Sequence, residues 1–182
     1  DIKSVSPPVD LVDGMVYRIT LRYQDASRNP TSSVVLDSMT FCGDQTLDLK
    51  ESDAWLLKNT LSGVVALPQN WTIGIRLPEK AFPGSLKLRL TRVDGPADPA
   101  SPRTIVLGSA FEAVGGAFHT NYTFFDLKDY SQPYPSEFIR DLLPSNAELV
   151  DGAVYRFVLS YQDCAGNPEN SFTRDLITYA GG

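Results

Sequence analysis

A segment of twenty residues occurs twice in this sequence, once near each end. Residues 11–30 have the sequence LVDGMVYRITLRYQDASRNP and residues 149–168 have LVDGAVYRFVLSYQDCAGNP, so the copies lie 138 residues apart (149 − 11). Further matches follow at Ser33 and Ser171, Asp37 and Asp175, and Thr40 and Thr178. A repeat of this length is a structural unit rather than a turn of a short solenoid. We therefore expect one whole period, preceded by a fragment of the period before it.

Each copy of the repeat predicts a β-hairpin. Side chains alternate with period two between an apolar and a more polar face, which is typical of a half-buried β-strand. Asp-Gly precedes each strand and Asn-Pro follows it, and both pairs are common in turns. A second strand is predicted at residues 32–41 and at residues 172–179. The apolar faces consist of Tyr17, Ile19, Leu21 and Tyr23 in the first copy and Tyr155, Phe157, Leu159 and Tyr161 in the second.

The region between the two copies predicts further strands of the same kind. Together with the second hairpin they give about seven short strands separated by turn residues, which favours an antiparallel β-sandwich. The fold class expected is therefore all-β. The additional strands are expected at residues 46–49, 71–77, 86–90, 104–107 and 118–124.

Little helix is expected. Residues 135–143 predict a helix, with Ser136 as its N-cap and with Phe138 and Leu142 four residues apart on one face. Residues 52–59 are compatible with a helical turn or with an irregular edge strand. Two proline-rich segments, residues 95–102 and 131–135, are expected to be exposed loops.

Composition narrows the classes of function. Apolar residues make up 42% of the 182 residues and charged residues 21%, an ordinary balance for a globular protein. The net charge of −6 argues against nucleic-acid binding, which needs a basic surface. No apolar run approaches the roughly 20 residues of a membrane span. Because the chain begins at Asp1 without an initiator Met or a signal peptide, we expect a processed product or an internal part of a longer protein.

The repeated segment resembles a known structural motif. Leu149 stands six residues before Tyr155, as Leu11 stands before Tyr17, and this spacing resembles the tyrosine corner of fibronectin type III and related immunoglobulin-like modules. The following YQDCAGNP is similar to the F–G turn of tandem immunoglobulin-like repeats in large secreted surface proteins. Asp151 replaces the proline of the fibronectin pattern, so the resemblance is to the superfamily. It implies a sandwich used as a spacer, adhesive or fibre unit, and it implies no activity.

The resemblance predicts where the modules divide. Residues 1–43 would contain the F–G hairpin that ends a preceding module, and residues 44–182 would form a complete immunoglobulin-like β-sandwich. The hairpin of residues 1–43 would then need strands from an upstream repeat or from a neighbouring subunit. The alternative is one enlarged sandwich that uses both hairpins.

The sequence offers little support for catalysis or for a bound cofactor. His119 is the only histidine, and no carboxylate or thiolate stands near it at the spacing of metal ligands. Glu79 has no obvious partner for acid–base chemistry, and neither a G-x-S-x-G elbow nor a phosphate-binding loop is present. The turn residues Asp25 and Asn29, like their counterparts Asp163 and Asn167, could offer oxygens to calcium, but capping of their own turns is favoured. We expect no enzyme activity and no metal.

Two sequons suggest N-glycosylation. Asn70 begins NWT and Asn121 begins NYT. Asn70 shares the strand face of Thr72, and Asn121 shares that of His119 and Thr123, so both are expected to face solvent. Glycans at Asn70 and Asn121 would place the protein outside the cell.

The two cysteines, Cys42 and Cys164, are each absent from the other copy of the repeat. Ala26 stands where Cys164 stands, and Ala180 stands where Cys42 stands. In cytosol they would be two free thiols, whereas in an oxidising compartment they can pair. In an immunoglobulin-like sandwich the F–G turn lies at the end where the first strand enters, so the resemblance implies a disulfide that braces the joint between modules.

Three functions follow as hypotheses. The first is a structural, non-enzymatic unit of a secreted, glycosylated fibre that assembles head to tail with copies of itself. The alternative is a cell-surface adhesin or a carbohydrate-binding β-sandwich, and a hydrolase accessory domain has only fold analogy in its favour. Contacts between strand edges of identical chains would distinguish the fibre from a sugar-binding groove lined by aromatic side chains.

Overall fold

The chain is described by a computed structural model. The residues that it describes are 10–13, 15–50, 65–68, 71–112, 122–124, 136–144 and 148–181. Within these ranges, residues 65–68, 71–72 and 122–124 are described by their backbone path alone.

The regular secondary structure of the described residues is almost entirely β-strand, which confirms the all-β prediction. They form three sheets, in which every pairing is antiparallel except that of β3 with β10. Within the described ranges, helix is limited to the single turn α2, Ser109–Glu112. The two-stranded sheets are β1 (Val16–Tyr23) with β2 (Ser32–Thr40), and β4 (Trp71–Ile73) with β7 (Tyr122–Phe124). The six-stranded sheet has the order β3 (Val65–Pro68), β10 (Asn170–Ala180), β9 (Val154–Tyr161), β5 (Lys87–Asp94), β6 (Arg103–Leu107) and β8 (Ile139–Leu143).

One hydrophobic core holds the sheets together after residue 44, and this part of the chain is called the body below. Alternate residues of β5, β6 and β9 point into the core, as period two requires. Side chains from β4 and the segment that follows it enter the same core. Its least exposed members include Ile73, Ile75, Leu86, Leu88, Leu90, Ile105, Leu107, Phe111, Tyr155, Phe157, Leu159 and Tyr161.

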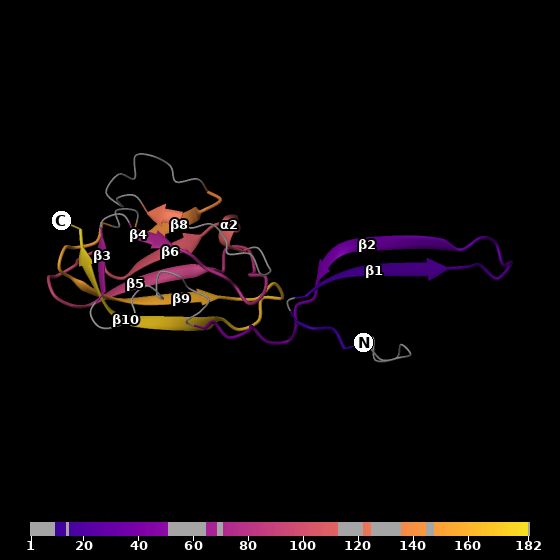
Figure 1. Ribbon diagram of the computed structural model, residues 1–182, viewed down its shortest axis with the longest axis horizontal. Coiled ribbons are helices and arrows are strands. Elements are labelled where there is room, and N and C mark those ends of the chain that lie inside the picture. Colours follow the sequence, from indigo (N-terminus) through magenta and orange to yellow (C-terminus); the bar gives the residue numbers. More distant parts are fainter. Residues whose placement is uncertain are drawn as a thin grey trace.

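The hairpin β1–β2 lies outside this core. Figure 1 shows it projecting from one end of the body, roughly along the long axis of the molecule. Among the described residues, β1 and β2 pair only with each other.

The helix predicted at residues 135–143 is wrong where the structure describes it. Residues 136–138 form a turn, and β8 then pairs with β6. Ile139 pairs with Leu107 and Asp141 pairs with the adjacent Val106. Arg140 between them therefore has no partner residue in β6 and forms a β-bulge. The bulge places the buried residues of β8 three positions apart, a spacing that imitates one face of a helix.

Candidate functional site: the joint between hairpin and body

The two copies of the repeat form the same turn. Asp25 accepts hydrogen bonds from the backbone N–H of Asn29 at 3.0 Å and from its Nδ2 at 2.7 Å. Asp163 accepts the same two bonds from Asn167, at 2.9 Å and 2.6 Å. The side-chain bond from Asn29, followed by its backbone bond, lowers the pKa of Asp25. Both carboxylates therefore cap their own turns, as the sequence favours.

A hydrogen bond between a tyrosine hydroxyl and the backbone five residues before it is also present twice. The hydroxyl of Tyr155 accepts a hydrogen bond from the N–H of Val150 at 3.0 Å, and the hydroxyl of Tyr17 accepts one from Val12 at 2.7 Å. Leu149 and Tyr155 are buried, whereas Leu11 and Tyr17 are only half-buried. The same local structure thus forms in the hairpin and in the body.

A bulge and an ion pair repeat as well. The register of β2 shifts around Ser38, whose φ is 58°, and that of β10 shifts around Leu176, whose φ is 61°. Arg18 pairs with Asp37 across the first bulge, and in the second copy Arg156 pairs with Asp175. These bulge residues stand 138 positions apart, so the period holds along the whole hairpin.

The copies differ in what covers their apolar faces. Phe157, Leu159 and Tyr161 are at most 1% exposed, while Ile19 and Leu21 are 47% and 64% exposed. In the body, β9 pairs with β5 and β10 pairs with β3, whereas the described residues offer β1 and β2 no third strand. The first hairpin therefore has the local structure of β9–β10, which lies inside a sheet, but among the described residues it has no neighbouring strands.

The base of this hairpin is attached to the turn between β9 and β10 (Figure 1). Cys42 and Cys164 form a disulfide with a Cα–Cα distance of 5.9 Å. Nδ2 of Asn167 donates to the carbonyl of Gly43 at 2.9 Å, and the N–H of Asp163 donates to Oγ1 of Thr46 at 3.3 Å. One covalent bond and two hydrogen bonds therefore fix where the hairpin ends and the body begins.

A buried carboxylate lies beneath this joint. Oε1 of Glu79 accepts hydrogen bonds from the N–H of Leu47 and, at 3.0 Å, from the hydroxyl of Tyr161, whereas Oε2 is buried without a partner among the described residues. Burial raises the pKa of Glu79, and the nearby charges of Asp13 and Asp163 raise it further, although the two hydrogen bonds act in the opposite direction. Burial and the charge of Glu79 likewise raise the pKa of Tyr161. Asp13 and Asp163 are far from Glu79 in the sequence, and only the fold brings them near it. The sequence therefore did not reveal these acidic neighbours.

Replacing Glu79 with glutamine should stabilise the protein at neutral pH, because the buried group would no longer carry a charge. A pKa raised in the folded state means that the carboxyl favours folding at low pH and that this contribution is lost as the pH rises. Wild type and E79Q should therefore converge in stability below the ordinary Glu pKa of 4.5 and diverge above it. Denaturant midpoints across this range test the prediction, with the exposed Glu137→Gln as control. A difference that does not change with pH would contradict it.

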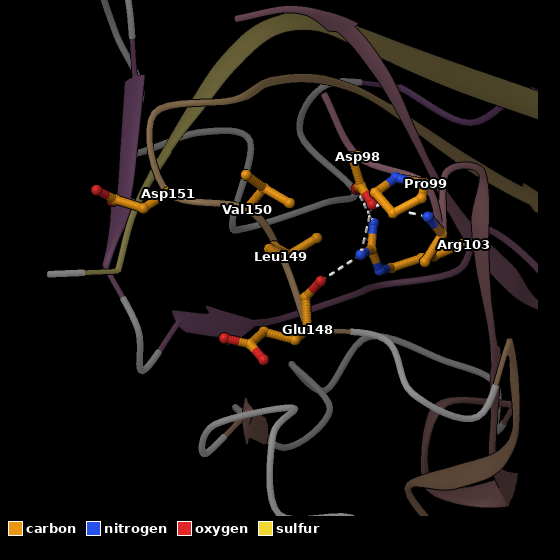
Figure 2. A pocket seen from close by; sticks show the side chains of 8 residues that line it. Asp98, Pro99, Arg103, Glu148, Leu149, Val150 and Asp151 are labelled. Atoms are coloured by element: carbon orange, nitrogen blue, oxygen red, sulfur yellow. Dashed lines mark hydrogen bonds and ion pairs between the residues drawn. The ribbon is translucent and has the colours of Figure 1, made fainter. Parts of the chain in front are cut away.

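The opposite end of the body contains a buried ion pair, which Figure 2 shows. Arg103 pairs with Asp98, with Nη2 to Oδ1 at 2.9 Å, and donates to the carbonyl of Glu148. Tyr155 donates its hydroxyl hydrogen to Asp98 at 2.7 Å. Burial acts to raise the pKa of Asp98, but the hydrogen bonds from Arg103 and Tyr155 outweigh it and the pKa is lowered. Burial raises the pKa of Tyr155 to about 12.

This cluster was not predicted from the sequence. Residues 95–102 do form a loop, but Asp98 within it is only 8% exposed, so the loop is not exposed throughout. A signal exists in the sequence, because Arg103 shares the inward face of Ile105 and Leu107, and a buried arginine needs a carboxylate partner. A cavity of about 350 Å³ adjoins the cluster and is lined by Asp98, Pro99, Ala100, Arg103, Glu148, Leu149, Val150 and Asp151.

Several predicted residues are not placed. Asn70, Asn121 and His119 lie outside the described residues, so N-glycosylation stays a prediction. Within the described ranges, no three or more His, Cys, Asp or Glu side chains are grouped so as to hold a metal ion. The described part of the chain also contains no helix that is long and apolar enough to cross a membrane.

Comparison with protein-family models, with curated proteins and with solved structures finds no match for this chain. Its function must therefore be argued from the hairpin, the joint and the body alone.

Proposed function

We propose that this protein is a non-enzymatic structural unit of a glycosylated extracellular fibre, built from immunoglobulin-like modules that follow one another head to tail. Residues 1–43 contain the last hairpin of one module, and residues 44–182 form the next. One observation carries the proposal: β1–β2 repeats the hydrogen bonds of β9–β10, yet its apolar face is exposed. A lone two-stranded hairpin is at best marginally stable in water, so this face needs a cover.

The second copy of the repeat indicates what that cover is. Phe157 and Leu159 of β9 lie opposite Leu90 and Leu88 of β5. By the 138-residue period, Ile19 and Leu21 of β1 should face a strand equivalent to β5, and β2 should pair in parallel with one equivalent to β3. The partner is therefore an immunoglobulin-like body that lacks its own last hairpin.

The joint supports a linear arrangement of modules. The base of one hairpin is held on the β9–β10 turn of the next module, and the hairpin extends roughly along the long axis (Figure 1). Such a contact joins different surfaces of the two modules, and unless the rotation closes a ring it propagates as a filament. A disulfide is compatible with an oxidising, extracellular compartment. Glycans at Asn70 and Asn121 would coat the fibre and reduce lateral aggregation.

An extended chain tests the proposal. A second copy of residues 44–148 is placed directly before Leu11, which preserves the natural period because Leu11 corresponds to Leu149. The added body should accept β1–β2 as its last hairpin, and amides on the outer edge of β1 should then exchange with deuterium about tenfold more slowly, or slower still. Hydrogen exchange measured by mass spectrometry gives the comparison with the 182-residue chain.

The control carries Leu88→Asp and Leu90→Asp in the added body only. These charges would occupy the face that covers Ile19 and Leu21, so the slower exchange should disappear. Equal exchange in the extended and original chains would contradict the proposal. Strong protection of β1 in the original chain as a monomer would instead favour the enlarged sandwich and the binding module.

A further inference from the structure

The end of the body opposite the joint has the same local structure as the base of the first hairpin. The N–H of Gly43 donates to Oδ1 of Asp13 at 2.7 Å, and the N–H of Gly181 donates to Oδ1 of Asp151 at 2.9 Å. Just before each glycine, the backbone of Phe41 bonds to Met15 and that of Tyr179 bonds to Ala153, both at 2.9 Å. Gly181 is therefore held as Gly43 is, and Gly43 is the residue whose carbonyl accepts the hydrogen bond from Asn167 in the joint.

The turn between β1 and β2 has the same local structure as the β9–β10 turn, which forms the other side of the joint. Nε2 of Gln24 donates to the carbonyl of Asn29 at 2.8 Å, as Gln162 does to Asn167 at 3.2 Å. Nδ2 of Asn29 donates one hydrogen to Asp25, which leaves the second hydrogen that Asn167 uses to reach Gly43. Asn29 is exposed at the tip of the projecting hairpin.

We propose that residues 24–29 of one chain dock on residues 149–152 and 179–181 of a second copy, with Asn29 donating to the carbonyl of Gly181. This inference rests on the proposed function and names the two surfaces that meet between chains. A second copy is the occupant because the two surfaces repeat the two sides of the contact that holds the β9–β10 turn on the first hairpin. Residues 24–29 are exposed, as are Asp151, Gly152 and Ala180 at the far end of the body. Each chain carries both surfaces, so the contact can repeat from one copy to the next.

The two exposed surfaces differ from the internal joint at the cysteines. Ala26 occupies the position of Cys164, and Ala180 occupies that of Cys42. Both alanines are exposed. The contact between copies would therefore be non-covalent and reversible, while the joint within each chain is locked by its disulfide.

Restoring the missing cysteines tests this inference. In the variant A26C/A180C, a docked pair of chains would hold the new thiols as Cys42 and Cys164 are held, with Cα atoms close enough to bridge. In a glutathione redox buffer the variant should form a ladder of disulfide-linked oligomers on non-reducing gels. The ladder should form about tenfold faster than random collision allows, or faster, because docking raises the effective concentration of the two thiols.

The control variant A26C/S171C moves one thiol from the end of the body to an exposed position at the other end of β10. Peptide mapping of A26C/A180C should show the two introduced thiols linked to each other and the native Cys42–Cys164 bond intact. Equal rates in the two variants would overturn the inference. The extended-chain measurement uses neither alanine, so slower exchange there with no ladder here would reject this contact and leave the proposed function standing.

Discussion

Replacing Asp98 with alanine should lower the free energy of unfolding by about 3–5 kcal/mol, because removing one partner of a buried ion pair leaves the other charge uncompensated. Arg103 is 1% exposed and its Nε already has no partner among the described residues, so solvent does not readily replace Asp98 as its partner. Asp98→Ala also removes the acceptor of the Tyr155 hydroxyl. Urea denaturation followed by tryptophan fluorescence measures the loss.

The exposed pair Arg156–Asp175 provides the matched control. It also joins an arginine to an aspartate, but both side chains are about half exposed. Asp175→Ala should therefore cost much less than Asp98→Ala, since solvent replaces a lost surface partner. Similar losses in the two variants would show that burial does not decide the contribution of Asp98. Because the pKa of Asp98 is lowered by folding, its contribution should also disappear as the pH falls below the ordinary Asp value of 3.8.

Replacing Cys42 and Cys164 together with alanine should lower the free energy of unfolding by about 4–5 kcal/mol on the chain-entropy model. The bond closes a loop of 122 residues, which includes most of the body but not β10. Removing the bond therefore gives the unfolded chain more freedom than removing one that closes a short loop. Equilibrium unfolding in guanidinium chloride gives the difference.

Reduced wild-type protein serves as the control for this variant. If the effect comes from the bond, wild type in excess dithiothreitol and the double variant should unfold at the same denaturant concentration. Coincidence of oxidised wild type with both would show that the disulfide does not contribute to folding. A difference between reduced wild type and the variant would instead assign the loss to packing of the alanines.

The sequence predicted the strands better than their surroundings. Alternation along β9 depends only on residues within one strand, so the buried face of Tyr155, Phe157, Leu159 and Tyr161 was predicted and is confirmed. A helix was predicted for β8 because Phe138 and Leu142 stand four residues apart, but Phe138 lies in the turn before the strand and the bulge depends on the partner strand.

Contacts between distant segments were harder to predict. The parallel pairing of β3 with β10 brings together segments more than 100 residues apart, and no local pattern specifies it. Glu79 acquires its acidic neighbours in the same way. The equivalence of the two hairpins was predictable, because it is written in the repeat itself. The segment that covers the first hairpin could not be predicted, because a repeat shows which segments are alike and not which segments are in contact.

The position of the disulfide determines how a fibre of such modules would carry tension. A pull along the long axis enters the body at Cys42 and crosses directly to Cys164, so the chain between them lies outside the load path. At about 3.3–3.6 Å per extended residue, the shielded loop holds roughly 400 Å of chain. With the bond intact, the body cannot lengthen by unravelling from that end. Reduction would turn each module from a stiff link into a reserve of extensible chain.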